Sequence, residues 1–421
     1  MMKRIVRIVS VAILSVVLSG HAPAHAGTTT PALVERGRYL AAAADCMACH
    51  SVTGGMAYAG GRPVATPFGV IYSSNLTPDR ETGLGLWSDA DFYRALHKGL
   101  SRDGSHLYPA FPYPYYTRIS QEDAAAIKAF LDTLAPVSRI IPPNRLPWPL
   151  NQRALMAIWN LLFFREGVTD QSAAIGSASP PNQDRGAYLV EALGHCGACH
   201  TPKSFLGADK SGASLQGGKI QNWLAPNSTG DQRTGMGNWS EDELVEYLQT
   251  GRNVRALAAG PMAEVVEYST SKLNESDLHA IASYLKRLPA AGLDATTSHP
   301  DPHEMKIGEA IFIDACAGCH QISGEAVPRA FTPLKGSAVV QSHDPLNVIR
   351  VILHGARAAT TDARPTPFTM PAYAWKLDDN QVAAVATYVR NTWGNVASPV
   401  KPAQVRALRG KLGQELVADP P

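Results

Sequence analysis

Cys46-Met-Ala-Cys-His50 is the stretch that decides the fold of this chain of 421 residues. Two later stretches repeat its pattern: Cys196-Gly-Ala-Cys-His200 and Cys316-Ala-Gly-Cys-His320. In each stretch two cysteines lie three positions apart, and a histidine follows the second cysteine directly. The chain has six cysteines, and these stretches use every one. No cysteine is left over for a framework of disulfide bonds.

The spacing is the one that covalent attachment of a c-type haem requires. Two thiols at this separation can add to the two vinyl groups of one porphyrin, and the adjacent histidine then lies under the iron as an axial ligand. We therefore expect three haem c groups. The expected attachment cysteines are Cys46, Cys49, Cys196, Cys199, Cys316 and Cys319, and the expected axial histidines are His50, His200 and His320.

Zinc half-sites and thioredoxin-like redox pairs are the competing interpretations of such cysteine pairs. Zinc would need two motifs close together, whereas these motifs start 150 and then 120 residues apart. A redox pair would not need a histidine after each second cysteine. The threefold pattern therefore favours haem.

The flanks of the motifs repeat as well, which indicates three similar units. Upstream of each motif lies a short helical pattern with a glycine: Arg36-Gly-Arg-Tyr-Leu40, Arg185-Gly-Ala-Tyr-Leu189 and Ile307-Gly-Glu-Ala-Ile311. Each unit ends in a second amphipathic helix: Ala126-Ile-Lys-Ala-Phe-Leu131, Ala280-Ile-Ala-Ser-Tyr-Leu285 and Ala384-Val-Ala-Thr-Tyr-Val389. Apolar residues at i, i+3 and i+4 mark a buried helix face. A small residue opposite an aromatic one lets two such helices cross closely.

Two serines predict the start of a further helix in the first and second units. In Trp87-Ser88-Asp-Ala-Asp91 and Trp239-Ser240-Glu-Asp-Glu243, a serine N-cap is followed three positions later by an acid. Gly99 and Gly251 end the corresponding helices.

The first 26 residues are typical of a secretory signal. Lys3, Arg4 and Arg7 precede an apolar run over residues 8–18, and Ala24-His25-Ala26 is a small-x-small cleavage site. The run is shorter than the roughly 20 residues of a spanning helix, so an uncleaved anchor is the less favoured alternative. Without this segment the chain has 35 basic and 36 acidic residues, a net charge of −1. Because no basic run stands out, nucleic acid is not an expected partner.

Two methionines are candidates for the second axial ligand, a choice that raises the reduction potential of a low-spin haem. Met262 lies 63 residues after Cys199, and Met370 lies 51 residues after Cys319. Each is in a proline-marked loop before the last helix of its unit, where a loop can place sulfur over the haem face. Methionine in a loop can also simply fill apolar space. We expect Met262 and Met370 to be iron ligands.

The first unit lacks a methionine at the aligned position, which Phe111 occupies 62 residues after Cys49. Phenylalanine has no lone pair to donate to iron. Three solutions for the first haem stay open at this point. His106 or His97 ligates the iron, Met56 does so from another loop, or the iron is five-coordinate and shielded by Phe111 and the nearby tyrosines.

The connector after the first unit contains an unusually apolar segment, within residues 146–164. Ala154-Leu-Met-Ala-Ile-Trp-Asn-Leu-Leu-Phe-Phe164 is too short to span a bilayer. Packing between the first two units is the slightly favoured interpretation. The alternative is an interfacial helix or a docking face for a partner or a quinone, because Trp and Phe flanked by Arg suit such a boundary.

Several stretches outside the cysteine motifs match one known family. They are Phe68-Gly-Val-Ile-Tyr-Ser-Ser-Asn-Leu-Thr-Pro78, Leu107-Tyr-Pro-Ala-Phe-Pro-Tyr113, Asn222-Trp-Leu-Ala-Pro-Asn227, Gly260-Pro-Met-Ala-Glu-Val-Val266, Met370-Pro-Ala-Tyr373 and Tyr388-Val-Arg-Asn-Thr-Trp-Gly-Asn395. The chain resembles the triple-haem cytochrome c subunit of bacterial periplasmic, membrane-associated dehydrogenases, such as those for alcohols, aldehydes, gluconate, sorbitol or fructose. The resemblance covers residues 32 to 395 approximately. That family often has methionine where Phe111 stands.

The expected fold is mainly α, with three tandem class-I-like cytochrome c domains and loop-rich connections. The expected segments are a signal peptide over 1–26, domain 1 over 27–135, a linker with the apolar segment over 136–180, domain 2 over 181–290, a linker over 291–302, domain 3 over 303–395 and a tail over 396–421.

The resemblance implies an electron-transfer subunit. It would accept electrons from a separate catalytic dehydrogenase subunit of flavin, quinoprotein or molybdenum type and pass them across three haems to ubiquinone or another respiratory acceptor. It implies a place in the periplasm, peripheral to the inner membrane. The residues agree, because they show no Ser/His/Asp constellation, no Gly-rich nucleotide loop and no recognisable carboxylate pair. The alternatives are a peroxidase-like multihaem oxidoreductase with an open first haem and a freestanding periplasmic carrier.

Overall fold

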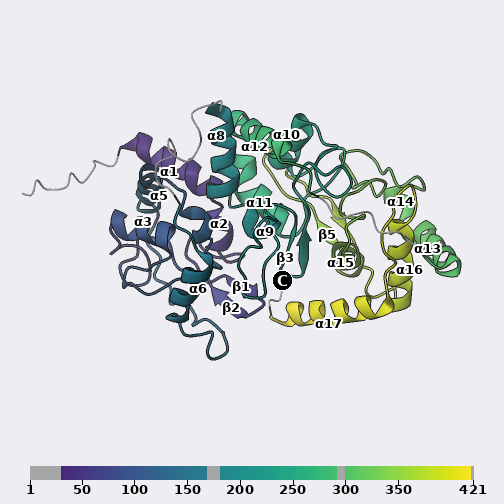
Figure 1. The fold of residues 1–421 in the computed structure, drawn as a ribbon, viewed down its shortest axis with the longest axis horizontal. Helices are drawn as coiled ribbons and strands as arrows, with labels where there is room; N and C mark the ends of the chain where they lie inside the picture. Colours follow the sequence, from purple (N-terminus) through teal and green to yellow (C-terminus); the bar gives the residue numbers. More distant parts are fainter. Residues whose placement is uncertain (1–29, 168–180, 292–298, 419–421) are drawn as a thin grey trace, which may run out of the picture.

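A computed structural model describes residues 30–167, 181–291 and 299–418 of the chain (Figure 1). The described part is mainly helical and contains small two-stranded antiparallel sheets, which confirms the mainly α prediction. The expected signal peptide, residues 1–26, lies outside the described residues. None of the described helices is at once long and apolar enough to cross a bilayer.

Figure 1 shows three groups of elements side by side, which we call the first, second and third units. The first comprises α1 (Pro31–Ala43), α2 (Cys46–Cys49), β1 (Pro63–Thr66), β2 (Gly69–Tyr72), α3 (Asp89–Lys98), α4 (Tyr113–Tyr116) and α5 (Gln121–Leu131). The second comprises α8 (Pro181–Tyr188), a π-helical turn η1 (Leu189–Leu193), α9 (Gly197–His200), β3 (Gly218–Ile220), β4 (Trp223–Ala225), α10 (Glu241–Thr250), α11 (Pro261–Tyr268), a 3-10 turn η2 (Thr270–Lys272) and α12 (Glu275–Arg287). The third comprises α13 (Pro302–Ala315), α14 (Ala317–His320), α15 (Leu346–His354), β5 (Ala356–Arg357), β6 (Thr369–Met370) and α16 (Asp379–Arg390). Helix α6 (Leu155–Phe163) follows the first unit, and α17 (Pro402–Ala418) follows the third.

Helices α3 and α10 begin and end at the residues that the sequence predicts. The hydroxyls of Ser88 and Ser240 accept hydrogen bonds from the third helical residue, whose acidic side chain binds back to the serine N–H. These reciprocal bonds satisfy N–H groups that have no partner inside the helix. Gly99 and Gly251 close the two helices in the left-handed conformation, which costs glycine little.

The first and last helices of each unit cross in close contact: α1 with α5, α8 with α12 and α13 with α16. A glycine lies at each crossing, namely Gly37, Gly186 or Gly308. A Cβ atom at these positions would lie 1.8, 2.2 and 2.3 Å from the carbonyl oxygens of Ala126, Ala280 and Ala384, respectively. Because such contacts are sterically forbidden, glycine is what allows the helix backbones to touch.

The first two units share an apolar core. Leu131 of α5, Leu193 of η1 and Leu278 of α12 belong to one continuous cluster of buried side chains. A separate cluster in the third unit is built around Phe312 of α13 and Leu353 of α15. The first two units therefore fold against each other, and the third packs beside them.

Reciprocal hydrogen bonds tie the first unit to the second. The Tyr39 hydroxyl on α1 donates to Asp277 Oδ2 on α12 at 2.6 Å. The Tyr188 hydroxyl on α8 donates to Asp123 Oδ2 on α5, also at 2.6 Å. Tyr39 and Tyr188 hold equivalent positions in their units, as do the two aspartates. The contact is therefore of the self-complementary kind that relates two copies by a twofold axis.

Each of these aspartates is also bound by an arginine of its own unit. Arg36 Nε donates to Asp123 Oδ1 at 3.0 Å, and Arg185 Nε donates to Asp277 Oδ1 at 2.9 Å. The equivalent residues of the third unit are Ile307, Ala310 and Gln381. Because two of these three side chains cannot hydrogen bond, the third unit has no such network.

The residues expected to form a C-terminal tail contain a packed helix, α17. Val405, Leu408 and Leu412 are buried in the core of the third unit. Arg409 donates to the carbonyl oxygens of Ala374 and Leu377, each at 2.9 Å. The spacing of the three apolar residues, i, i+3 and i+7, is the helical signal in this segment.

Candidate haem sites

Each Cys-x-x-Cys-His motif forms a short helix just after the first long helix of its unit. The six cysteines are free thiols. Burial raises the pKa of the Cys46 and Cys196 thiols to about 12 and that of Cys316 to about 11, so these thiols are protonated at neutral pH. Among the described residues, no cluster of His, Cys, Asp or Glu side chains could hold a metal ion on its own. The described part of the chain therefore offers no zinc ligand set of the usual kind.

All three motif histidines are held in the same way. The Nδ1 atom lies 2.7 Å from the Ser74 carbonyl oxygen in His50, 2.7 Å from that of Pro226 in His200 and 3.0 Å from that of Thr332 in His320. Because a carbonyl only accepts, Nδ1 must carry the proton, and the lone pair is on Nε2. Burial also lowers the pKa of each imidazole and favours the neutral form. These residues therefore fit a haem iron, which needs a neutral, oriented imidazole.

The second and third motifs open onto one continuous cavity of about 650 Å³. Its lining includes both attachment cysteines, the histidine and the expected methionine of each site: Cys196, Cys199, His200, Met262, Cys316, Cys319, His320 and Met370. The sequence spacing assigned these residues to two separate sites. In the structure, the residues of both sites line the same cavity.

Met262 and Met370 come from segments that the backbone joins together. Met262 is the second residue of α11, and Met370 ends β6, where it pairs with Ala356 of β5. Just after β5, Ala358 forms an antiparallel bridge with Ala259, three residues before Met262. The sequence contained no signal for this connection, because it depends on how the second and third units pack.

The first motif has a different surrounding. Phe111 packs edge-on against the Tyr116 ring, with centroids 5.5 Å apart, and the Tyr116 hydroxyl donates to the carbonyl oxygen of Ala44 at 2.8 Å. Phe111 is therefore part of the apolar core beside the first attachment turn.

The three alternative ligands of the first site differ in burial and in the residues they contact. The Met56 side chain is 59% exposed. The buried ring of His97 stacks on Tyr93 with centroids 5.1 Å apart, and its Nε2 lies 3.8 Å from Glu166. His106 Nδ1 lies 3.4 Å from the Asn160 amide nitrogen. Both histidines thus contact the connector that contains α6.

Two residues that directly precede motifs were missed by the sequence interpretation. His195 is buried, its ring lies 5.3 Å from that of Tyr116, and burial lowers its pKa to about 4. Asp45 is buried, and its Oδ1 atom makes no hydrogen bond within the described part of the chain. Both line the common cavity and have positive φ angles. Their position before the first cysteine of a motif is the only signal that could have singled them out.

The fold and the three histidine sites define a haem-binding c-type cytochrome. A cytochrome c family model matches residues 34–135 and 305–393. The gluconate 2-dehydrogenase cytochrome c subunit of Pantoea cypripedii is 42% identical over 401 residues, which cover 90% of each chain. The cytochrome c subunit of the quinone alcohol dehydrogenase of Gluconobacter oxydans is 37% identical over 405 residues, 92% of this chain and 84% of that one.

The fructose dehydrogenase cytochrome subunit of Gluconobacter japonicus is 35% identical over 406 residues, 89% of this chain and 82% of that one. The chain belongs to this family, the cytochrome c subunits of bacterial dehydrogenases.

Proposed function

We propose that the chain is an electron-transfer subunit with three covalently bound c-type haems, one in each of three tandem class-I-like cytochrome c domains. The observation that carries the proposal is the repeated imidazole geometry. At every motif a backbone carbonyl holds the histidine Nδ1 atom and leaves Nε2 free for iron. When bound, the haem groups supply reversible one-electron redox chemistry.

The residues around each site have distinct proposed roles. The cysteine pairs hold the porphyrin, and the motif histidines provide the proximal ligand. Met262 and Met370 complete the ligand sets of the second and third sites, which the shared cavity supports. The first site differs, because Phe111 offers no ligand atom.

A relay also needs its sites close together, and the contacts between units support this. The second and third sites share one cavity. The first and second are linked through Tyr116, which binds the carbonyl of Ala44 near one motif and contacts His195 beside the other. We propose that the second site lies between the other two, which the order of the units in Figure 1 supports.

The names of the relatives support a catalytic dehydrogenase partner. The relatives are named as cytochrome subunits of gluconate, alcohol and fructose dehydrogenases. We propose that a separate catalytic subunit, of flavin, quinoprotein or molybdenum type, supplies electrons to this chain. Ubiquinone or another respiratory acceptor would receive them, at the periplasmic face of the inner membrane.

One surface supports the proposed membrane side. Helix α6 uses Trp159 for packing, since its Nε1 donates to the Leu206 carbonyl at 3.0 Å and its ring contacts Tyr113. The opposite face is bare: Leu161 is 76% exposed, and Phe205 on the adjacent loop is 86% exposed. The contacts of Trp159 agree with the packing interpretation of this segment, and the exposed face supports the proposal of an interfacial or docking role.

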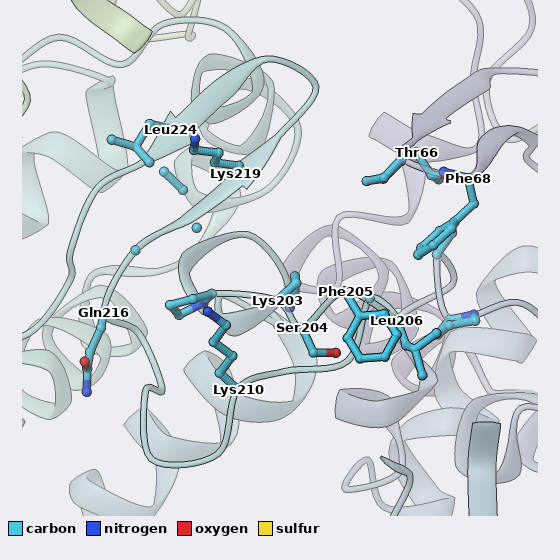
Figure 2. A pocket seen from close by; sticks show the side chains of 18 of the residues that line it. Thr66, Phe68, Lys203, Ser204, Phe205, Leu206, Lys210, Gln216, Lys219 and Leu224 are labelled. Atoms are coloured by element: carbon cyan, nitrogen blue, oxygen red, sulfur yellow. The ribbon is translucent and has the colours of Figure 1, made fainter. Parts of the chain in front are cut away.

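The apolar surface borders a second cavity of about 1030 Å³. In Figure 2 the loop with Phe205 and Leu206 lies between Phe68, from the β1–β2 turn, and Lys210. Leu224, Ala225 and Pro226 line this cavity and also the cavity of the second and third sites. An apolar opening rimmed by lysines suits an anionic lipid surface and an apolar acceptor.

Purification from native membranes tests the proposed function. We expect a dehydrogenase subunit to co-purify, three covalent haems per chain, and reduction of the haems by the dehydrogenase substrate. A homogeneous protein that reduces peroxide without a dehydrogenase would instead establish the peroxidase-like alternative. A chain that never co-purifies with a dehydrogenase would indicate a freestanding carrier.

A further inference from the structure

Met262 depends on its surroundings for its position, because the helix that carries it is short. Helix α11 has eight residues. Gly260 is its N-cap and Pro261 is its first residue. Helices of this length gain most of their stability from tertiary contacts. The contacts that α11 makes with neighbouring units therefore decide where the Met262 sulfur lies.

One side of α11 is bound by the first unit. Arg62 Nη2 donates to Glu264 Oε1 at 3.0 Å and to Oε2 at 2.7 Å. Arg62 Nη1 donates to the carbonyl oxygen of Ala48 at 2.5 Å. Ala48 lies between Cys46 and Cys49 and is buried. A single guanidinium thus joins the first attachment turn to the helix that carries Met262.

Arg62 is itself held in place. Its backbone N–H donates to Ser73 Oγ at 3.0 Å, and its side chain is 27% exposed. The planar guanidinium binds two acceptors in fixed directions, which a flexible ammonium group cannot do. The contact therefore fixes both the distance and the orientation of α11.

One turn further along the same face of α11, the helix is bound by the third unit. Glu267 Oε1 accepts a hydrogen bond from the backbone N–H of Thr360 at 2.6 Å. The bridge from Ala259 to Ala358 holds the approach to the helix. Neither contact involves the first unit. From that unit Arg62 provides the charged hydrogen bonds to α11, and at the other end of the helix the C-cap Ser269 hydroxyl donates to the Ala43 carbonyl oxygen at 3.3 Å.

We propose that Arg62 is a positioning residue that orients Met262 toward the iron of the second haem, and that it acts from the neighbouring unit. The inference depends on the proposed role of Met262 as the sixth ligand. Without Arg62, α11 keeps its contact with the third unit but loses its tether to the first attachment turn. The bond from sulfur to iron should then weaken, and the reduction potential of that haem should fall.

The test uses the full-length haem-loaded protein with the substitutions Arg62→Gln and Met262→Ala. The readouts are the methionine-to-ferric-iron charge-transfer absorption and the reduction potential of each haem in a spectroelectrochemical titration. Met262→Ala identifies the part of the absorption that belongs to the second site. We expect Arg62→Gln to remove about half or more of the absorption that belongs to the second site. We also expect the reduction potential of the second haem to fall, so that its oxidised-to-reduced ratio at a fixed applied potential changes by about tenfold.

Arg329→Gln is the matched control. Arg329 also binds both oxygens of a glutamate in another unit, Glu246 on α10, but this pair does not include α11. It should leave the absorption and all potentials unchanged. Arg62→Lys should restore part of the signal, because an ammonium group can bind one of the two acceptors. Glu264→Gln provides a second variant, with a smaller effect in the same direction, if Arg62→Gln does not fold.

The outcomes separate the two proposals. If Met262→Ala changes the absorption and Arg62→Gln and Glu264→Gln do not, the positioning role of Arg62 is wrong and the ligand assignment stands. If Met262→Ala has no effect on the absorption, Met262 is not a ligand and the inference fails with it.

Discussion

The Tyr39 hydroxyl donates a 2.6 Å hydrogen bond to Asp277, a residue 238 positions further along the chain. The Tyr188 hydroxyl makes the reciprocal bond to Asp123. Both aspartates are buried, and each lies in the helix that crosses the first helix of its own unit. The two bonds therefore connect the two halves of the shared core.

Removal of these hydroxyls should loosen the first two units together. We expect Tyr39→Phe and Tyr188→Phe each to lower the free energy of unfolding by about 1–3 kcal/mol, because a buried carboxylate oxygen loses a donor. Denaturant unfolding of the haem-loaded protein measures the effect. Tyr268→Phe, at an exposed tyrosine, is the control. Equal stability of all three variants would contradict the structural role of the pair.

The same pair should make stability depend on acid pH. Burial raises the pKa of Asp277, but hydrogen bonds from Arg185 and Tyr39 outweigh this and hold the pKa below its usual value. Because the folded pKa is lower than the unfolded value of about 3.9, the stabilisation is complete above that value and is lost as pH falls through the folded pKa.

We therefore expect the unfolding temperatures of the parent protein and of Asp277→Asn to converge below about pH 4 and to differ at neutral pH. Thermal unfolding from pH 7 to pH 3 measures this. A gap between the two proteins that is constant over this range would show that the carboxylate charge is not the cause.

The glycine crossings should tolerate no side chain. Gly186→Ala would place a Cβ atom 2.2 Å from the Ala280 carbonyl oxygen, so α8 and α12 must separate. We expect a loss of about 1–3 kcal/mol in the free energy of unfolding. Gly410→Ala on α17 is the control, since no atom lies within 4 Å of a Cβ there. That variant should gain about 0.5–1 kcal/mol from helix propensity alone; a similar loss in both would refute the steric explanation.

Each Cys-x-x-Cys-His motif should account for one covalently bound haem. Replacement of Cys316 and Cys319 by serine should lower the covalent haem content from three groups to two, because serine cannot form the thioether bonds. Intact mass and haem staining measure this. The same pair of changes at Cys46 and Cys49 should have the same effect, despite the missing methionine at Phe111. Three haems in either variant would disprove attachment at that motif.

The bare face of α6 should decide membrane binding. We expect Leu161→Asp with Leu162→Asp to reduce sedimentation with vesicles of anionic phospholipid by about tenfold, because the aspartates remove apolar surface and are repelled by anionic headgroups. Trp375→Asp is the control, since Trp375 is 82% exposed but lies in the third unit. Unchanged sedimentation of the α6 variant, or equal loss in the control, would exclude α6 as the contact.

The sequence by itself determined the features that depend on neighbouring residues. The Cys-x-x-Cys-His spacing, the serine caps at Ser88 and Ser240 and the glycine-bearing helix patterns all act within a few positions, so they could be recognised without a structure. The distances from Cys199 to Met262 and from Cys319 to Met370 likewise predicted residues that the structure brings to one cavity.

Only the tertiary structure decided which distant residues meet. The bonds of Tyr39 to Asp277 and of Arg62 to Glu264 join residues that no local pattern relates. The segment expected as a tail packs as α17, and α6 divides into a packed face and a bare one. The physical reason is that local spacing sets which face of a helix is apolar. The packing of whole helices against each other then determines which partner covers that face.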